Sequence, residues 1–223
     1  MKTTTPPRIV IIGAGGHACV AAEVAAVRFQ ILGFLSDQAD TSLVRPYGPW
    51  LGTVGQFEEM RVVHGDFCVH VAIGDNGARR RLVSSLVEAH PDLEFPTLVH
   101  ASASISKAAE IAEGVLVCAG AVVAVGARLG AHAIVNTGAS LDHHASLGDY
   151  ASMAPGARTG GNAVIGVGSF IGMNTVIHHG VKVGHDTIIG SMSLVNRDLP
   201  DKVLAYGNPC RIIRPREPGD KYL

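Results

Sequence analysis

The hydrophobic pattern of the chain changes its period once, near residue 98. Before that point, short β-branched runs alternate with segments rich in Ala and Val, as is typical of strands that alternate with helices. The expected strands are Arg8–Ile12, Ile31–Leu35 and Val69–Ile73, the expected helices Cys19–Arg28 and Ala78–Ala89, and the expected loop Asp40–Gly55. This alternation predicts a parallel sheet with helical crossovers, which is an α/β, Rossmann-like arrangement.

From Val99 onward the chain repeats every six residues, without a slip over 96 residues. Fifteen of the sixteen first positions are aliphatic, with Thr159 as the exception, and fourteen of the sixteen fifth positions are Ala, Ser or Thr. A period of six fits neither a helix of 3.6 residues per turn nor an alternating strand. It predicts a left-handed parallel β-helix with three short strands per coil, whose aliphatic positions fill the interior. The predicted domains are residues 1–98, residues 99–197 and a C-terminal tail, residues 198–223.

Composition excludes several classes of protein. Hydrophobic residues make up 47% of the chain and charged residues 17%, as in globular proteins, and the net charge of −1 offers no basic surface for nucleic acid. No apolar run reaches the roughly 18 residues of a membrane span, and residues 1–8 lack the apolar segment of a signal peptide. The four cysteines form no CxxC pair, so a cytoplasmic location is expected.

A glycine-rich turn follows the first expected strand. Gly13-Ala-Gly-Gly-His-Ala18 matches G-x-G-x-x-A, and Asp37 follows the second strand. Such glycines let backbone N–H groups approach a phosphate, and the acidic residue accepts a ribose hydroxyl. NAD is the rival ligand, but about 90 residues with at most four strands hold only one mononucleotide half, and a merely structural turn is the other alternative. Ala72-Ile-Gly-Asp-Asn76 ends the third strand, so we expect it at the same ligand-binding edge.

Histidines cluster in the repeat, at Asp142-His-His144, His178-His179 and His185. No cysteine accompanies them. His143 and His179 are two coils apart, which at about 5 Å per coil predicts a separation of about 10 Å; we therefore expect no metal site. Because histidine has an ordinary pKa of about 6.5, it suits removal of a proton from an attacking amine, while a backbone N–H group stabilises the oxyanion.

These residues together resemble the bacterial family of sialic-acid O-acetyltransferases and nucleotide-sugar 4-amino N-acetyltransferases, in the hexapeptide-repeat acyltransferase superfamily. The resemblance runs from about Ile9 to Pro215. The motifs that carry it are the two glycine motifs above, Leu98-Val-His100, Asn136-Thr137, Asp142-His143, Gly160-Gly-Asn162 and Tyr206-Gly-Asn-Pro-Cys-Arg211.

The resemblance implies an N-acetyltransferase that moves acetyl from acetyl-CoA to the amine of a nucleotide-linked 4-amino sugar, for surface glycan synthesis. It also implies a homotrimer with active sites between neighbouring β-helices. The alternatives are O-acetylation of a sugar hydroxyl, as on sialic acid, and a non-catalytic nucleotide-sugar-binding β-helix. The expected sugar-nucleotide site comprises Gly13, Gly15, Gly16, His17, Ser36, Asp37, Gly74 and Asp75, and the expected acetyl-CoA site comprises Ser152, Gly172, Met173, Gly190 and Ser191.

The same resemblance implies that His143 is the general base, acting by direct attack of the acceptor, and that Asn136 lies in the active site. Two positions depart from the family pattern. Many members have Glu directly after the base, where this chain has His144, and members often have His where Ser152 stands. Asp142 is the other candidate for orienting the base, so the sequence leaves open whether Asp142 or His144 supports His143.

Overall fold

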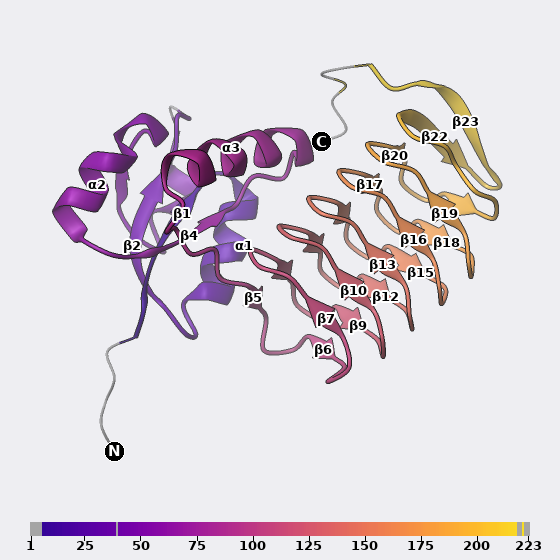
Figure 1. The fold of residues 1–223 in the computed structure, drawn as a ribbon, viewed down its shortest axis with the longest axis horizontal. Helices are drawn as coiled ribbons and strands as arrows, with labels where there is room; N and C mark the ends of the chain where they lie inside the picture. The colour runs from indigo at the N-terminus through magenta and orange to yellow at the C-terminus, as the bar shows by residue number, and fades with distance from the viewer. Residues whose placement is uncertain (1–5, 39, 218–219, 221–223) are drawn as a thin grey trace. The chain divides into compact units, whose positions relative to one another are not determined.

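The computed structural model describes residues 6–38, 40–217 and 220, which fall into two compact units. One unit contains the chain up to Gly74 together with Arg81–Leu98, and the other contains Asp75–Arg80 together with the chain from Val99 onward (Figure 1). Among the described residues, no helix is long and apolar enough to cross a membrane.

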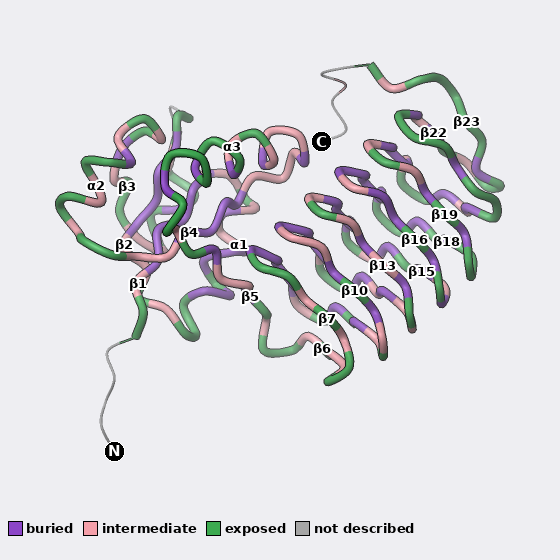
Figure 2. The backbone as a smooth tube through the Cα atoms, viewed as in Figure 1, coloured by how far each residue is buried: buried purple, intermediate pink, exposed green. Residues whose placement is uncertain are grey.

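The first unit is built on a four-stranded parallel sheet in the order β3-β2-β1-β4. The strands are β1 (Arg8–Ile12), β2 (Gln30–Leu35), β3 (Trp50–Gly52) and β4 (Cys68–Val71). The helices are α1 (Gly16–Ala25), η1 (Ser42–Val44), η2 (Val54–Gln56), α2 (Phe57–His64) and α3 (Asn76–Ala89), of which α3 has its first turn in the second unit. The β-branched runs form the buried centre of this unit, as Figure 2 shows for β1.

The three expected strands and two expected helices are present, with ends shifted by a few residues. The expectation of a plain loop over Asp40–Gly55 was wrong, because β3 lies within it and pairs with β2 through Phe34 and Trp50. The sequence pattern also missed α2. This helix buries only Phe57, so it has no regular apolar stripe to reveal it.

The second unit is a left-handed parallel β-helix of two-residue strands (Figure 1). These strands are β5 (Leu98–Val99), β6 (Ser104–Ile105), β7 (Glu110–Ile111), β8 (Leu116–Val117), β9 (Val122–Val123), β10 (Arg128–Leu129), β11 (Ile134–Val135), β12 (Ser140–Leu141), β13 (Ser146–Leu147), β14 (Ser152–Met153), β15 (Arg158–Thr159), β16 (Val164–Ile165), β17 (Phe170–Ile171), β18 (Val176–Ile177), β19 (Lys182–Val183), β20 (Ile188–Ile189) and β21 (Leu194–Val195). They stack into three parallel sheets, in which every strand pairs with strands 18 residues away.

The interior of the β-helix is filled as the hexads predict. First-position residues such as Val117 and Leu141, and fifth-position alanines such as Ala121 and Ala139, belong to one buried cluster. At the corners from Gly114 to Met192, the second residue adopts a left-handed backbone, which Gly occupies freely and Asn or His tolerates at some cost. The coil therefore places residues i and i+18 directly above one another at every corner.

The chain expected as a tail contains two further strands. β22 (Val203–Gly207) pairs in parallel with β20, and β23 (Cys210–Pro215) returns antiparallel to β22. Ala205 and Cys210 are buried in the same cluster as the coil interior. This hairpin adds the last two strands of the eight-stranded sheet and covers apolar surface at the last coil.

Candidate active site

His143 and His144 occupy the corner between β12 and β13, and each imidazole lies over a glycine of an adjacent coil. A Cβ atom at Gly161 would overlap the Cε1–Nε2 edge of His143. In the other direction, a Cβ atom at Gly126 would lie 2.7 Å from Cδ2 and 2.9 Å from Nε2 of His144. The positive φ of His144, 55°, turns its side chain toward the preceding coil. The missing side chains of the two glycines therefore make room for both rings.

The group that faces the His143 imidazole is His144. The two Nδ1 atoms are 3.3 Å apart, and the rings meet edge to face with centroids 5.6 Å apart. Asp142 is used differently: its Oδ1 accepts a hydrogen bond of 2.7 Å from the backbone N–H of His143. Its own N–H donates to Thr159 Oγ1 at 3.0 Å. The Asp142 carboxylate thus holds the backbone of the corner.

His179 lies closer to His143 than the sequence predicted. The ring centroids are 6.1 Å apart, so the expected separation of about 10 Å was wrong. Gly161 lies between the two in the stack and has no side chain, so the His143 ring can lean across it. Within the described part of the chain, no three His, Cys, Asp or Glu side chains are grouped to hold a metal ion.

Asn136 lies directly after β11, where its Oδ1 accepts a 2.8 Å hydrogen bond from the N–H of Thr137. This is the corner that precedes the His143 corner along the coil. One chain therefore carries Asn136 and His143 on successive corners of the triangular coil.

Four of the expected acetyl-CoA residues lie on the corners after β17 and β20, in the same column of stacked corners as Asn136, which follows β11. Met173 is 52% exposed and Ser191 is also exposed. The glycines beside them are crowded: a Cβ atom at Gly172 would lie 2.5 Å from the Ser191 nitrogen, and one at Gly190 would lie 2.9 Å from Tyr206 Cβ. Coil packing alone thus requires Gly172 and Gly190, whereas Met173 and Ser191 are available to a ligand.

Ser152 is buried under the Asp75–Arg80 segment of the same unit. Its hydroxyl donates to Asn76 Oδ1 at 2.6 Å and accepts from Arg79 at 3.2 Å. Arg79 is itself only 2% exposed and also donates to the backbone carbonyls of His132 and Tyr150, at 3.0 and 2.9 Å. This network could not be predicted from the sequence, because the run Arg79-Arg80-Arg81 does not reveal which arginine is buried.

Next to Arg79, the ring of His132 stacks on Tyr150 with centroids 5.3 Å apart. Burial, reinforced by the positive charge of Arg79, lowers the pKa of His132 to about 4. This histidine is therefore neutral at physiological pH. The residue is only 3% exposed, so it is not accessible to a substrate.

In the α/β unit, the expected sugar-nucleotide residues up to Gly74 follow the carboxyl ends of the parallel strands. The N–H of Gly13 donates to Leu35 O at 2.9 Å, which joins the turns after β1 and β2. Gly13 has φ of 132°, and a Cβ atom there would lie 2.6 Å from Ala72 O. At Gly15 and Gly16, which open α1, an added Cβ atom meets no heavy atom within 4 Å. Gly13 is thus required by the fold, while open space lies beside Gly15 and Gly16.

The remaining acidic and polar positions at this edge have defined local partners. Asp37 is exposed, and its Oδ1 accepts from the Val54 N–H at 2.9 Å. Ser36 is buried, with its hydroxyl accepting from the Gln38 N–H at 3.1 Å. His17 lies in the first turn of α1, and Gly74 ends the α/β unit before α3. Asp75 caps α3, since its Oδ1 accepts from the Ala78 N–H at 2.7 Å.

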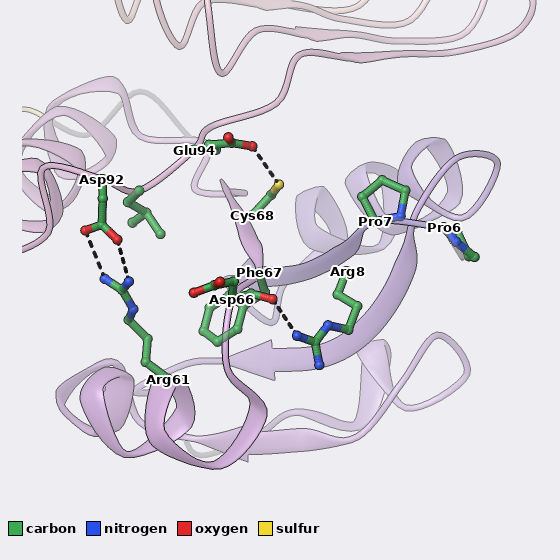
Figure 3. Close-up of a pocket in the computed structure, with 10 residues that line it drawn as sticks. Pro6, Pro7, Arg8, Arg61, Asp66, Phe67, Cys68, Asp92 and Glu94 are labelled. Atoms are coloured by element: carbon green, nitrogen blue, oxygen red, sulfur yellow. Dashed lines mark hydrogen bonds and ion pairs between the residues drawn. The ribbon is translucent and has the colours of Figure 1, made fainter. Parts of the chain in front are cut away.

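A cavity of about 530 Å³ lies elsewhere in the α/β unit, at the amino ends of β1 and β4 (Figure 3). Arg61 and Asp92 pair across part of it at 2.6 Å, and the Cys68 thiol donates to Glu94 at 3.5 Å. Burial and the adjacent Glu94 raise the pKa of Cys68 to about 11, so this thiol is not activated as a nucleophile. Ligands of parallel sheets bind at the opposite, carboxyl edge.

Comparisons with known proteins agree with a two-part acyltransferase. The PglD N-terminal domain family matches residues 8–86, and the bacterial transferase hexapeptide family (six repeats) matches residues 162–197. The fold and site thus define a hexapeptide-repeat acyltransferase that carries a Rossmann-like N-terminal domain. A comparison with curated protein sequences gives no match.

Comparison with solved structures identifies the family within the hexapeptide-repeat acyltransferases. The acetyltransferase domain of PglB from Neisseria gonorrhoeae FA1090, in complex with acetyl coenzyme A, is 33% identical, with 93% of this chain and 100% of that chain covered and a TM-score of 0.85. A histidine-to-alanine mutant of GDP-perosamine N-acetyltransferase from Caulobacter crescentus, in complex with CoA and GDP-perosamine, is 31% identical, with 92% and 95% covered and a TM-score of 0.85. WeeI from Acinetobacter baumannii AYE, at 24% identity and a TM-score of 0.81, shares the fold. The chain belongs to this family of sugar acetyltransferases and is an acetyltransferase.

Proposed function

We propose that this protein transfers acetyl from acetyl-CoA to the amine of a nucleotide-linked 4-amino sugar, with His143 as the general base. The observation that carries the proposal is the corner at His143. A half-buried imidazole lies over bare Gly161 and has a nitrogen partner at Nδ1, on a fold shared over nearly its whole length with a structure that holds acetyl coenzyme A.

The reaction is a direct attack within a ternary complex. The amine nitrogen attacks the thioester carbonyl, a C–N bond forms, and His143 Nε2 takes the proton that the amine loses. The C–S bond then breaks, and the protonated His143 returns the proton to the CoA thiolate. A backbone N–H group stabilises the oxyanion of the tetrahedral intermediate. No acyl-enzyme forms, so the kinetics are of the ternary-complex type.

We place acetyl-CoA along the outside of the β-helix, against the corners that carry Met173 and Ser191. Both side chains are exposed, and they stand one above the other in the stack. Ser152 stays a weaker candidate for this contact, because its hydroxyl already bonds to Asn76 and Arg79.

We place the sugar nucleotide at the carboxyl edge of the α/β sheet. The open space beside Gly15 and Gly16 at the start of α1 suits a diphosphate, because the helix N-terminus presents N–H groups and partial positive charge. Asp37 has one carboxylate oxygen bonded to Val54, and its other oxygen suits a ribose hydroxyl. His17, Ser36 and Gly74 complete the proposed site within this unit.

We further propose a homotrimer whose active sites form between neighbouring β-helices. Asn136 and His143 lie on successive corners of one coil, so a site that uses both is completed by residues of two chains. Exposed valines on the outer faces, among them Val122, Val164 and Val176, offer apolar surface for such packing. Acetyl-CoA and nucleotide sugars are cytoplasmic metabolites, which is consistent with a cytoplasmic enzyme.

The proposal is tested by CoA release over a panel of UDP-, GDP- and dTDP-linked 4-amino sugars, each beside its 4-hydroxy counterpart. We expect turnover with an amino sugar, a loss of kcat of about 10²–10⁴-fold in His143→Ala, and KM values close to wild type. Turnover of the hydroxyl sugars alone would identify an O-acetyltransferase. Binding of the nucleotide sugar without any CoA release would identify a non-catalytic protein.

A further inference from the structure

The corner at His143 contains an unusual arrangement of two consecutive histidines. Their rings point toward opposite coils, His143 over Gly161 and His144 over Gly126, and this divergence brings their Nδ1 atoms to 3.3 Å. Two nitrogens at this distance hold one proton between them, because two N–H groups facing each other would repel. One ring must therefore donate and the other accept.

The direction of this hydrogen bond decides whether His143 can act as a base. If His143 donates through Nδ1–H, its Nε2 carries the free lone pair. If His144 donates instead, the proton of neutral His143 sits on Nε2, and the ring cannot take a proton from the acceptor there. A base therefore needs its partner to be an acceptor at Nδ1.

We propose that His144 is a positioning residue: its Nδ1 accepts the hydrogen bond from Nδ1–H of His143 and so holds Nε2 free to receive the proton of the acceptor amine. This proposal rests on the proposed function of His143. It assigns to a neutral imidazole the task that an acidic residue has in many members of the family. Asp142 holds the corner backbone through Oδ1, whereas the atom 3.3 Å from His143 Nδ1 is Nδ1 of His144.

The nature of the partner has a consequence for the pH dependence of the reaction. Among the described residues, the titratable side chains around the His143 ring are Asp142, His144 and His179. A neutral acceptor stabilises the protonated His143 less than a carboxylate in the same place would. The acidic limb of the kcat/KM profile should accordingly move to higher pH when residue 144 is made anionic.

Position 144 allows closely matched substitutions. In His144→Asn, Oδ1 is separated from Cα by as many bonds as Nδ1 is in histidine, and Asn accepts the left-handed backbone, as Asn162 does one coil further on with φ of 57°. His144→Asp puts a charged acceptor at the same place. His144→Phe keeps a ring over Gly126 and removes the acceptor. His179→Phe is the control, because it alters a neighbouring ring that has no Nδ1 contact with His143.

We expect His144→Phe to lower kcat about ten- to a hundredfold, with both KM values within about threefold of wild type. His144→Asn should restore most of that loss, and His144→Asp should shift the acidic limb upward by about one pH unit. His179→Phe should leave kcat unchanged within about threefold. Full activity in His144→Phe, or equal losses in Phe, Asn and Asp with no shift of the limb, would overturn the proposal.

A second measurement separates this proposal from the proposed function. Histidine labelled with ¹³C reports the tautomer and the titration midpoint of His143 by NMR, with its signals assigned from His143→Asn. The Nδ1–H tautomer of His143 at neutral pH, and a titration midpoint of His143 that rises in His144→Asp, would support the proposed hydrogen bond between the two histidines even if no amino sugar is turned over. The Nε2–H tautomer would overturn it even in an active enzyme.

Discussion

Two sets of glycines, one in each unit, have opposite surroundings, and the difference separates side-chain packing from a candidate ligand site. In the β-helix, the space beside Gly161, Gly126 and Gly114 is filled by the rings of His143, His144 and His132. In the α/β unit, the space beside Gly15 and Gly16 is empty. Each of these crowded glycines accommodates the ring of a histidine. The open glycines at the start of α1 leave space for a ligand.

Within the β-helix, the same packing also yields histidines of different character. His132 over Gly114 is buried beside Arg79 and Tyr150, whereas His143 over Gly161 is half-buried and His144 over Gly126 is exposed. Exposure therefore decides which histidine can exchange a proton with a substrate. Substitutions in both units test this comparison.

The crowded glycine under the proposed base should be intolerant of a methyl group. Gly161→Ala should lower kcat by about a hundredfold or more, because the new Cβ atom displaces the Cε1–Nε2 edge of His143. Steady-state kinetics measure kcat, and thermal unfolding measures Tm, which we expect to fall only slightly. Gly120→Asn is the control, since that corner glycine has φ of 65° and open space beside it. Equal kcat in both variants would break the link between this glycine and the base.

The buried histidine should make folding stability depend on pH. In the unfolded chain a histidine gains its proton near pH 6.5, but His132 in the fold gains it near pH 4, so the unfolded state binds the proton first. Its contribution is present above pH 6.5 and decreases as the pH falls toward 4, by about 2 kcal/mol between pH 7 and pH 5. Urea unfolding at both pH values measures this. In His132→Asn the difference should shrink by about that amount, and an unchanged difference would contradict the assignment.

The open glycine at the start of α1 should report on ligand binding alone. Gly15→Val should raise KM for the sugar nucleotide by about tenfold, because the branched side chain enters the space proposed for the phosphates. KM for acetyl-CoA and Tm should stay near wild type, since Gly15 has φ of −85° and a free Cβ position. Gly13→Ala is the contrast: it should lower Tm, because a Cβ atom there meets Ala72 O. Equal weakening of both substrates by Gly15→Val would remove the phosphate site from this turn.

The smallest effect is expected at the proposed acetyl-CoA corner. Ser191→Trp should raise KM for acetyl-CoA severalfold, with little change in KM for the sugar nucleotide. The indole would cover the exposed surface shared with Met173. Initial-rate kinetics with each substrate varied in turn make the test. Unchanged kinetics would mean that the coenzyme lies elsewhere on the β-helix.

The fold was predictable from the sequence where the hydrophobic pattern is periodic, and not where the pattern is irregular. The hexads predicted the β-helix and its buried positions, because an interior residue must be aliphatic in every coil. The pattern did not predict the short strand β3 or helix α2, since neither has enough regularly spaced apolar residues. The hairpin of β22 and β23 was not predicted either, because it lies beyond the six-residue repeat.

For the candidate site, the linear sequence singled out the candidate residues: the histidine pair after Asp142 and the glycine turn after β1. The arrangement of their side chains follows from the folded chain. The direction of each ring depends on a glycine 18 residues away, and the burial of Arg79 and Ser152 depends on a segment more than 70 residues away. Stacking of coils creates these neighbours, and a linear pattern does not contain the side-chain directions that follow from it.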